Sequence, residues 1–308
     1  MAPSERPRRD IHLREHIRLA VTGLTGQVVS ALIARAPQDV EIIALGRPQF
    51  ELGKRDAVLV SLKAAHCNAI INAAAYTAVD KAESEPDVAM RINGEGAGFV
   101  AEAAAALDLP LLHLSTDYVF DGALDRPYRE DDPTGPTGAY GRAKLEGEKR
   151  IAEIHANHVI LRTAWVYSPY GANFVKTMLR LGETRDEVRV VSDQIGNPTS
   201  ALDIADALLK ISRQITRDQS SELRGIFHMA GQGEANWADF AAAIFEGAHR
   251  YGRRETIVKP IATADYPTPA KRPANSRLDT GKLRRIYGVS LPHWRTSVED
   301  CVQKLLKN

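Results

Sequence analysis

Cysteine is scarce in this sequence of 308 residues, and long apolar runs and an excess of one charge are missing. Its two cysteines, Cys67 and Cys301, lie far apart and outside any CxxC or similar metal-binding spacing, which fits reduced intracellular thiols. No apolar run approaches the roughly 20 residues that cross a bilayer. The 40 basic and 39 acidic side chains nearly balance, so charge indicates neither a nucleic-acid nor a membrane partner. We expect a cytoplasmic protein.

The first 16 residues also lack the apolar core of a secretory signal, and we expect them to form a flexible charged extension. The run from His12 to His16 matches the HxxEH zinc signature. Because this match lies in a charged leader just before the first apolar run, we predict no metal there.

From Ile17 onward, short apolar runs alternate with longer helical segments, which is typical of βαβ units and a parallel sheet. The predicted strands, the last two weaker, are Ile17–Thr22, Glu41–Leu45, Ala69–Asn72, Leu111–Ser115, Val159–Thr163, Val188–Val191 and Ile226–Met229. Helices are predicted at Asp87–Leu107, Tyr140–His155 and Leu291–Leu306. The fold class is therefore α/β, with a Rossmann-type doubly wound parallel sheet.

Beyond Thr163 the alternation becomes irregular and proline-rich loops follow, which favours a smaller C-terminal substrate-binding lobe. We assign the dinucleotide-binding domain to 17–164, with roughly 186–225 and 237–258. The lobe receives roughly 165–185, 226–236 and 259–308.

A glycine turn, Gly23 to Gly26, directly follows the first strand and precedes a helix. In that context backbone N–H groups can approach a pyrophosphate at the helix N-terminus, although an ordinary strand–helix turn is the alternative. Val29 occupies the third glycine position, which predicts looser packing between helix and strand. The second strand ends in Arg47, where NAD-binding folds carry an acid, so we predict a preference for NADPH over NADH. The alternative is a solvated surface arginine.

Hydroxyl groups follow the fourth strand at Ser115 and Thr116, at the edge where open α/β folds bind ligands. A later helix begins with Tyr140, and Lys144 lies on the same helical face. Reduction of a ketone needs a proton donor, and a phenol is suitable. We expect the Lys144 ammonium to lower the pKa of Tyr140 by about three units, roughly 4 kcal/mol. The alternative is a packed tyrosine beside a solvated lysine.

Seven stretches carry a resemblance to the dTDP-4-dehydrorhamnose reductases, which are extended short-chain dehydrogenases. They are GLTGQV, NAAAYTAVDKAE, STDYVFDG, YGRAKLEGEK, RTAWVY, DQIGNPT and YPTPAKRPANSRLDT, and they extend over nearly all of Ile17–Leu306. The resemblance implies reduction of the C4 ketone of dTDP-4-dehydro-β-L-rhamnose to dTDP-L-rhamnose by NADPH, with NADH as the second cofactor.

The resemblance also implies the residues of the site. The expected catalytic residues are Thr116, Tyr140 and Lys144. The expected cofactor-binding residues are Gly23, Gly26, Gln27, Val28, Arg47, Glu51, Leu52, Ala74, Ala75, Tyr76, Thr77, Tyr140 and Lys144. The nucleotide-sugar substrate is bound by Thr116, Asp117, Tyr118, Tyr140 and Trp165. Ala31 replaces a glutamate that some members use at a magnesium-bridged dimer interface, so we predict no metal, and a homodimer stays open.

Two related classes are alternatives. The 4,6-dehydratases carry a glutamate where this sequence has Tyr118, and elimination needs that carboxylate, so reduction is favoured. The regulatory β subunit of methionine adenosyltransferase is similar to these reductases, and an intact Tyr140–Lys144 pair does not separate the two. Among other residues, we expect Trp237 and Phe240 in the core, His113 as a core histidine, and His155 and His158 on the surface.

Overall fold

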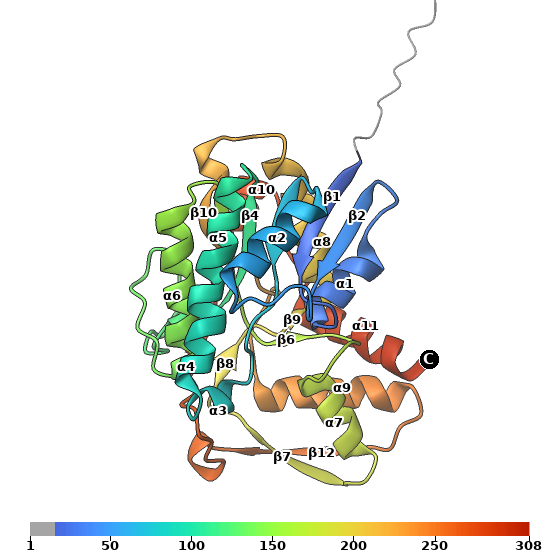
Figure 1. Cartoon of the computed structure of the whole chain (residues 1–308). Helices are drawn as coiled ribbons and strands as arrows, with labels where there is room; N and C mark the ends of the chain where they lie inside the picture. Colours follow the sequence, from blue (N-terminus) through green and yellow to red (C-terminus); the bar gives the residue numbers. More distant parts are fainter. Residues whose placement is uncertain (1–15, 308) are drawn as a thin grey trace, which may run out of the picture.

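Six parallel strands form the central sheet of the computed structural model, which describes residues 16–307 (Figure 1). In spatial order they are β10 (Gly225–His228), β5 (His158–Thr163), β4 (Leu111–Thr116), β3 (Ala69–Asn72), β1 (Ile17–Thr22) and β2 (Val40–Leu45). The strand order reverses between β1 and β3, and such a switch point opens a ligand crevice at the carboxyl edge. The predicted Rossmann-type fold is confirmed. The expected extension and its HxxEH match lie, apart from His16, outside the described residues.

Helices cover both faces of this sheet (Figure 1). One face carries α1 (Gln27–Arg35) and α8 (Ala201–Ile215), whose apolar side chains share one buried cluster with β1. The other face carries α2 (Arg55–Ala65), α5 (Gly96–Ala106) and α6 (Ala139–Ile154). Between 16 and 307, no helix is long and apolar enough to cross a membrane.

The helix predicted at Asp87–Leu107 is not continuous. It consists of α4 (Pro86–Ala89), the π-helix η1 (Met90–Glu95) and α5. In η1, the Asn93 side chain accepts a hydrogen bond from the backbone N–H of Tyr76 at 2.8 Å and donates one to the carbonyl oxygen of Tyr76 at 2.9 Å. A wide turn in a helix often marks a functional site, and here it fixes the segment that follows β3.

The smaller lobe packs below the carboxyl edge of the sheet in Figure 1. Its helices are α7 (Phe174–Gly182), α9 (Trp237–Arg250) and α11 (Trp294–Lys307), which share one apolar cluster. Its short strands are β6 (Val166–Tyr167), β7 (Glu187–Val191), β8 (Ile195–Gly196), β9 (Thr199–Ser200), β11 (Ala235–Asn236), β12 (Ile257–Ile261) and β13 (Asn275–Ser276). The remaining elements are α3 (Val79–Ala82), the 3-10 helices η2 (Asp117–Val119), η3 (Ser221–Leu223) and η4 (Thr263–Asp265), and α10 (Gly281–Tyr287).

Three segments differ from the expected boundaries. Residues 226–228 belong to β10 and complete the central sheet rather than the lobe, because they pair with β5. Conversely, β7 pairs with β12, and α9 shares its apolar cluster with α7 and α11, so both belong with the lobe. The predicted closing helix is present as α11. The functional roles of the two units remain a prediction.

Candidate functional site

The carboxyl end of β4 presents a short run of polar side chains. Thr116 caps η2, since its hydroxyl oxygen accepts the backbone N–H of Tyr118 at 3.2 Å. The same hydroxyl donates to Asp117 Oδ1 at 2.9 Å. Thr116 and Asp117 are both buried, so their polar atoms face a site with little water.

Helix α6 places a second set of polar groups beside this run. Tyr140, Lys144 and Glu148 follow one another at intervals of four residues and therefore lie along one helical face. Gly141 allows the close approach, because a Cβ there would lie 2.2 Å from the carbonyl oxygen of Tyr118. The rings of Tyr118 and Tyr140 meet edge to face with centroids 5.5 Å apart. The structure thus brings the three predicted catalytic residues to one edge.

The pKa of Tyr140 differs from the value predicted from the sequence. Burial raises the pKa of Tyr140 to about 12, the Asp117 charge adds to this rise, and a hydrogen bond with Thr116 opposes it. Burial also lowers the pKa of Lys144 to about 8, against the opposing charge of Glu148. The pKa of Tyr140 therefore lies above its usual value and not about three units below it as predicted, so Tyr140 is a protonated phenol at neutral pH.

Asp117 carries an unused hydrogen-bond acceptor. Burial raises the pKa of Asp117 to about 6, while hydrogen bonds from Ser276 and Thr116 oppose the rise. Its Oδ2 atom is buried without a hydrogen-bond partner among the described residues. Because an unpaired buried carboxylate oxygen is costly, it is suited to accept a ligand hydroxyl.

A buried ion pair lies behind the site. The Arg162 guanidinium donates to Glu148 Oε2 at 2.7 Å, and both side chains are 3% exposed. Glu148 also accepts the Ser115 hydroxyl, and Arg162 lies over the Phe120 ring at 5.0 Å. Sequence reasoning missed Glu148 and Arg162. The only signal was the position of Glu148 one turn beyond Lys144.

The glycine turn fits a dinucleotide phosphate. Gly23 has a φ of +105°, which few other residues adopt, and a Cβ at Gly26 would meet no atom within 4 Å. No side chain caps the N-terminus of α1 at Gly26, so its N–H groups are available. Val29 is buried in the apolar cluster between α1 and the sheet, so the looser packing predicted there is not seen.

Gln27 and Val28 use their side chains elsewhere. Gln27 Oε1 accepts the Ser168 hydroxyl at 2.8 Å and Asn173 Nδ2 at 3.0 Å, which ties α1 to the segment leading into the lobe. Val28 is buried in the apolar cluster under α1. Only the backbone of these two residues is therefore suited to contact a pyrophosphate.

The segments that follow β2 and β3 hold the other expected cofactor residues. Arg47 is exposed, and its charge contributes to lowering the pKa of Glu51 after the larger effect of Lys54. The Leu52 side chain packs in the core under α2 and α5, so it is not available to contact a cofactor. Ala74 and Ala75 are partly buried and Thr77 is exposed.

Trp165 occupies a strained position at the entrance to the lobe. Its φ is +47°, and its ring stacks on Trp237 with centroids 3.6 Å apart. A Cβ at Gly196 would lie 2.5 Å from the indole, so a glycine is needed there. Phe240 is buried as predicted, whereas Trp237 is only partly buried. His155 and His158 are also buried, contrary to prediction, and each hydrogen-bonds a backbone carbonyl, which offsets the cost of burying its ring.

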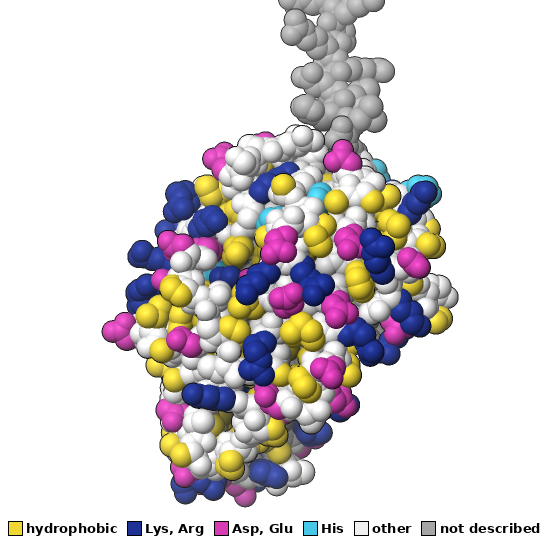
Figure 2. All heavy atoms as spheres, turned by 60° about the vertical axis from the view of Figure 1, so that its left-hand side comes forward, with side chains coloured by type: hydrophobic (Ala, Val, Ile, Leu, Met, Phe, Trp, Pro, Cys, Tyr) yellow, Lys and Arg dark blue, Asp and Glu magenta, His cyan; other side chains and the backbone are white. Residues whose placement is uncertain are grey.

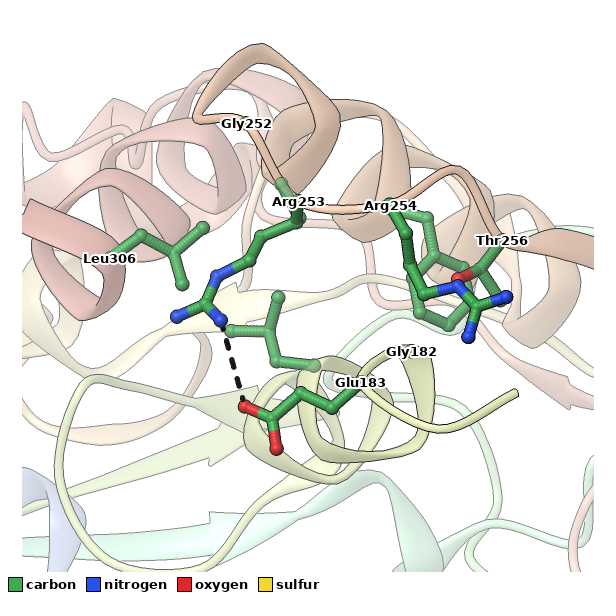
Figure 3. A pocket seen from close by; sticks show the side chains of 10 residues that line it. Gly182, Glu183, Gly252, Arg253, Arg254, Thr256 and Leu306 are labelled. Atoms are coloured by element: carbon green, nitrogen blue, oxygen red, sulfur yellow. Dashed lines mark ion pairs between the residues drawn. The ribbon is translucent and has the colours of Figure 1, made fainter. Parts of the chain in front are cut away.

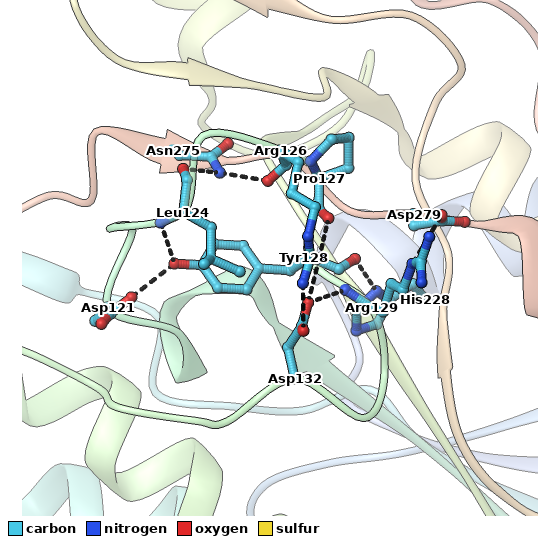
Figure 4. A network of polar contacts seen from close by, with 10 residues as sticks. All are labelled: Asp121, Leu124, Arg126, Pro127, Tyr128, Arg129, Asp132, His228, Asn275 and Asp279. Carbon is cyan, nitrogen blue, oxygen red and sulfur yellow. Dashed lines mark hydrogen bonds and ion pairs between the residues drawn. The ribbon is translucent and has the colours of Figure 1, made fainter.

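Two loops complete the carboxyl edge. Tyr128 donates to Asp121 Oδ1 at 2.6 Å, and Asn275 donates to the carbonyl oxygens of Leu124 and Arg126, which joins this loop to β13 (Figure 4). The late loop is held by Arg272, whose Nη2 donates to Asp80 at 2.9 Å. Sequence reasoning missed both anchors.

A separate hollow lies in the lobe between α7, α9 and α11. Leu179, Phe245 and Leu306 line it together with the ion pair of Arg253 and Glu183, whose charged atoms are 3.9 Å apart (Figure 3). None of the expected site residues lines this hollow. The arrangement at β4 and α6 is therefore the better candidate.

Comparison with known proteins agrees with that choice. The family model described as the RmlD substrate binding domain matches residues 17–307. The dTDP-4-dehydrorhamnose reductase of Sinorhizobium fredii is 54% identical over 290 residues, which cover 94% of this chain and 98% of that protein. The structure of a dTDP-4-dehydrorhamnose reductase from Bacillus anthracis in complex with NADP matches with a TM-score of 0.87 and 33% identity, over 94% of this chain and 99% of that one. The structure of a dTDP-4-dehydrorhamnose reductase from Clostridium acetobutylicum matches with a TM-score of 0.87 and 36% identity, over 94% of this chain and 99% of that one.

Proposed function

This chain belongs to the family of the RmlD substrate binding domain, and from that membership we propose that it is a dTDP-4-dehydrorhamnose reductase. It reduces the C4 ketone of dTDP-4-dehydro-β-L-rhamnose to dTDP-L-rhamnose, with NADPH as the reductant. One observation carries the assignment. In this chain, which the family model matches over residues 17–307, the proton donor Tyr140 lies beside Thr116 and Asp117 at the carboxyl edge of β4.

The residues present suit a nicotinamide dinucleotide. The open turn at Gly26 and the uncapped start of α1 receive the pyrophosphate. Arg47 and Glu51 border the adenosine end, and the segment from Ala74 to Thr77 borders the nicotinamide. When bound, NADPH supplies the hydride that reduces the C4 carbon.

The chain's own residues supply the proton and the orientation. Tyr140 keeps its proton at neutral pH and donates it to the C4 oxygen as that oxygen becomes an alkoxide. Thr116 donates to the same oxygen once its hydroxyl turns from Asp117 Oδ1, and Lys144 holds the nicotinamide ribose. Asp117 accepts a sugar hydroxyl at its unpartnered Oδ2, while Tyr118 and Trp165 line the sugar and diphosphate.

The test is to supply dTDP-4-dehydro-β-L-rhamnose and NADPH, follow the NADPH absorbance, and identify the sugar product by NMR. We expect NADPH consumption in step with dTDP-L-rhamnose. A folded protein that binds NADPH without turnover would overturn the proposal, and tight binding to a methionine adenosyltransferase would then favour a regulatory role.

We further propose a cytoplasmic location. The support is chemical: Cys67 and Cys301 are both free cysteines, as expected in a reducing compartment.

A further inference from the structure

A row of buried polar side chains runs from the central sheet into the catalytic helix. It consists of Thr22 at the end of β1, Asn72 in β3, His113 in β4 and Lys144 in α6. Their exposed fractions are 0%, 2%, 1% and 2%. In so dry a setting each donor needs an acceptor, so the heavy-atom positions determine where the protons lie.

Thr22 determines which atoms donate and which accept in the hydrogen bonds along this row. Its hydroxyl oxygen accepts the backbone N–H of Ala73 at 3.0 Å and of Ala74 at 2.9 Å. Both lone pairs are then used, and the hydroxyl proton must be donated onward. The recipient is Asn72 Oδ1 at 2.8 Å. The Asn72 amide nitrogen therefore points away from Thr22, toward β4.

Asn72 in turn fixes the proton on His113. Its Nδ2 lies 3.0 Å from His113 Nδ1. An amide nitrogen only donates, so Nδ1 accepts and carries no proton. The neutral ring must then carry its proton on Nε2. In a cationic ring, Nδ1–H and the Asn72 amide would be two donors facing each other. Burial also keeps the pKa of His113 well below its usual value.

The protonated Nε2 faces Lys144. The two nitrogens are 3.2 Å apart, and Lys144 Nζ also donates to the carbonyl oxygen of Leu114 at 2.6 Å. An ammonium has only donors, whereas a neutral amine has a lone pair that can accept from Nε2–H. We infer that His113, with its proton fixed on Nε2 by Thr22 and Asn72, donates to Lys144 and so stabilises the neutral amine form of Lys144 at this position.

His113 is thus a positioning residue, which acts on the cofactor through Lys144. The charge of Glu148, one turn along α6, favours the ammonium form of Lys144. Burial outweighs this charge and lowers the pKa of Lys144 to about 8. To bind the cofactor ribose as an ammonium, Lys144 must leave Nε2 and take a proton from solvent onto its lone pair. The inference therefore rests on the proposed function and adds that NADPH binding takes up a proton.

Calorimetry of NADPH binding measures this uptake. Titrations at a pH of about 8.5 in two buffers with different ionisation enthalpies report the number of protons bound, since the amine form dominates above the pKa of Lys144. The 2′-phosphate of NADPH titrates near 6 and does not contribute. We expect wild-type protein to take up a large fraction of one proton, and Lys144→Met to take up none.

His113→Asn removes the donor selectively. The asparagine oxygen replaces Nδ1 as acceptor for Asn72, but no N–H reaches Lys144, so the neutral amine loses its donor, more ammonium is present before binding, and the uptake should fall. His158→Asn, which alters another buried histidine, is the matched control and should retain the uptake. Unchanged uptake in His113→Asn would overturn the inference.

Two further measurements do not depend on that variant folding. In assigned ¹⁵N-histidine NMR spectra of the wild type, the His113 ring should be the Nε2–H tautomer, and the Nδ1–H form would overturn the inference. Asn72→Asp offers an acceptor to Nδ1–H, so it should move the proton off Nε2 and also lower the uptake. NADPH binding and turnover without uptake would overturn the inference alone, whereas absence of NADPH binding would overturn the proposed function with it.

Discussion

At the scale of single residues, the acid role of Tyr140 can be separated from its packing. Tyr140→Phe removes only the hydroxyl, so we expect kcat to fall by about 10²–10⁴ while NADPH affinity changes little. Tyr118→Phe makes the same change on the neighbouring ring, 5.5 Å away, and should mainly alter KM. Steady-state kinetics with binding titrations test both. A comparable fall in kcat for the two variants would remove Tyr140 from its distinct role.

Arg47 tests cofactor preference. It is exposed beside Glu51 at the end of β2, where a 2′-phosphate would lie. A charge-assisted hydrogen bond contributes about 1.5–3 kcal/mol, so Arg47→Ala should lower kcat/KM for NADPH by roughly 10- to 100-fold. The same variant assayed with NADH is the control and should change little. Equal losses with both cofactors would contradict a 2′-phosphate contact.

The residues that the sequence could predict are those whose chemistry follows from local spacing. Thr116 follows a strand, and Tyr140 and Lys144 share a helical face, so their meeting could be inferred. Asn72 and Arg162 could not be inferred, because their roles arise from contacts across 41 and 14 residues of chain. The pKa of Tyr140 was mispredicted for the same reason: burial depends on tertiary packing.

At the scale of elements, the sequence predicts whether a segment is a helix or a strand, but not whether a helix is continuous. All five stronger strands appear close to their predicted bounds, since apolar runs between turns signal buried parallel strands. The break at η1 had no periodic signal. It arises because the helix must place Asn93 against the backbone of Tyr76 while packing on α6.

The contact between α6 and η1 depends on Gly147. A Cβ at this position would lie 2.2 Å from the carbonyl oxygen of Asn93, which is backbone and cannot easily move. Gly147→Ala should therefore lower the free energy of unfolding by about 1–3 kcal/mol. Gly247 in α9 is the matched control, because a Cβ there lies an ordinary 3.5 Å from Val302. Gly247→Ala should be neutral or stabilise by up to about 1 kcal/mol. Urea unfolding midpoints that shift in the same direction would contradict this account.

At the scale of the whole molecule, the lobe is assembled from segments far apart in sequence, which explains why its boundaries were misassigned. Strand β7 pairs with β12 across 70 residues at Glu187 and Ile257, and no local pattern encodes that partner. The surface in Figure 2 mixes both charges, in keeping with the near balance of 40 basic and 39 acidic residues. Charge therefore gave no clue to the ligand, and the site had to be inferred from the strand edge.

Acid stability is a property of the whole fold, and buried His228 should contribute to it. Its ring is 0% exposed and its Nδ1 lies 3.1 Å from the carbonyl oxygen of Tyr128. Burial, followed by the charge of Arg162, lowers the pKa of His228 to about 3. The unfolded chain binds this proton near 6.5, so the stabilising contribution is complete above that pH and is lost as the pH falls toward 3.

In His228→Gln, the free energy of unfolding should fall less steeply as the pH is lowered. An amide N–H can still donate to Tyr128, but the variant no longer has a group that the unfolded chain alone can protonate. Between about pH 6 and pH 4, the slope of unfolding free energy against pH should fall by up to roughly 1.4 kcal/mol per unit. Urea unfolding at a series of pH values measures the slope, and His249→Gln, at an exposed position in α9, is the control. Because the remaining buried histidines and carboxylates are common to all three proteins, only the difference in slope is attributed to His228. Parallel curves for His228→Gln and the wild type would show that the folded protein binds this proton as readily as the unfolded chain does.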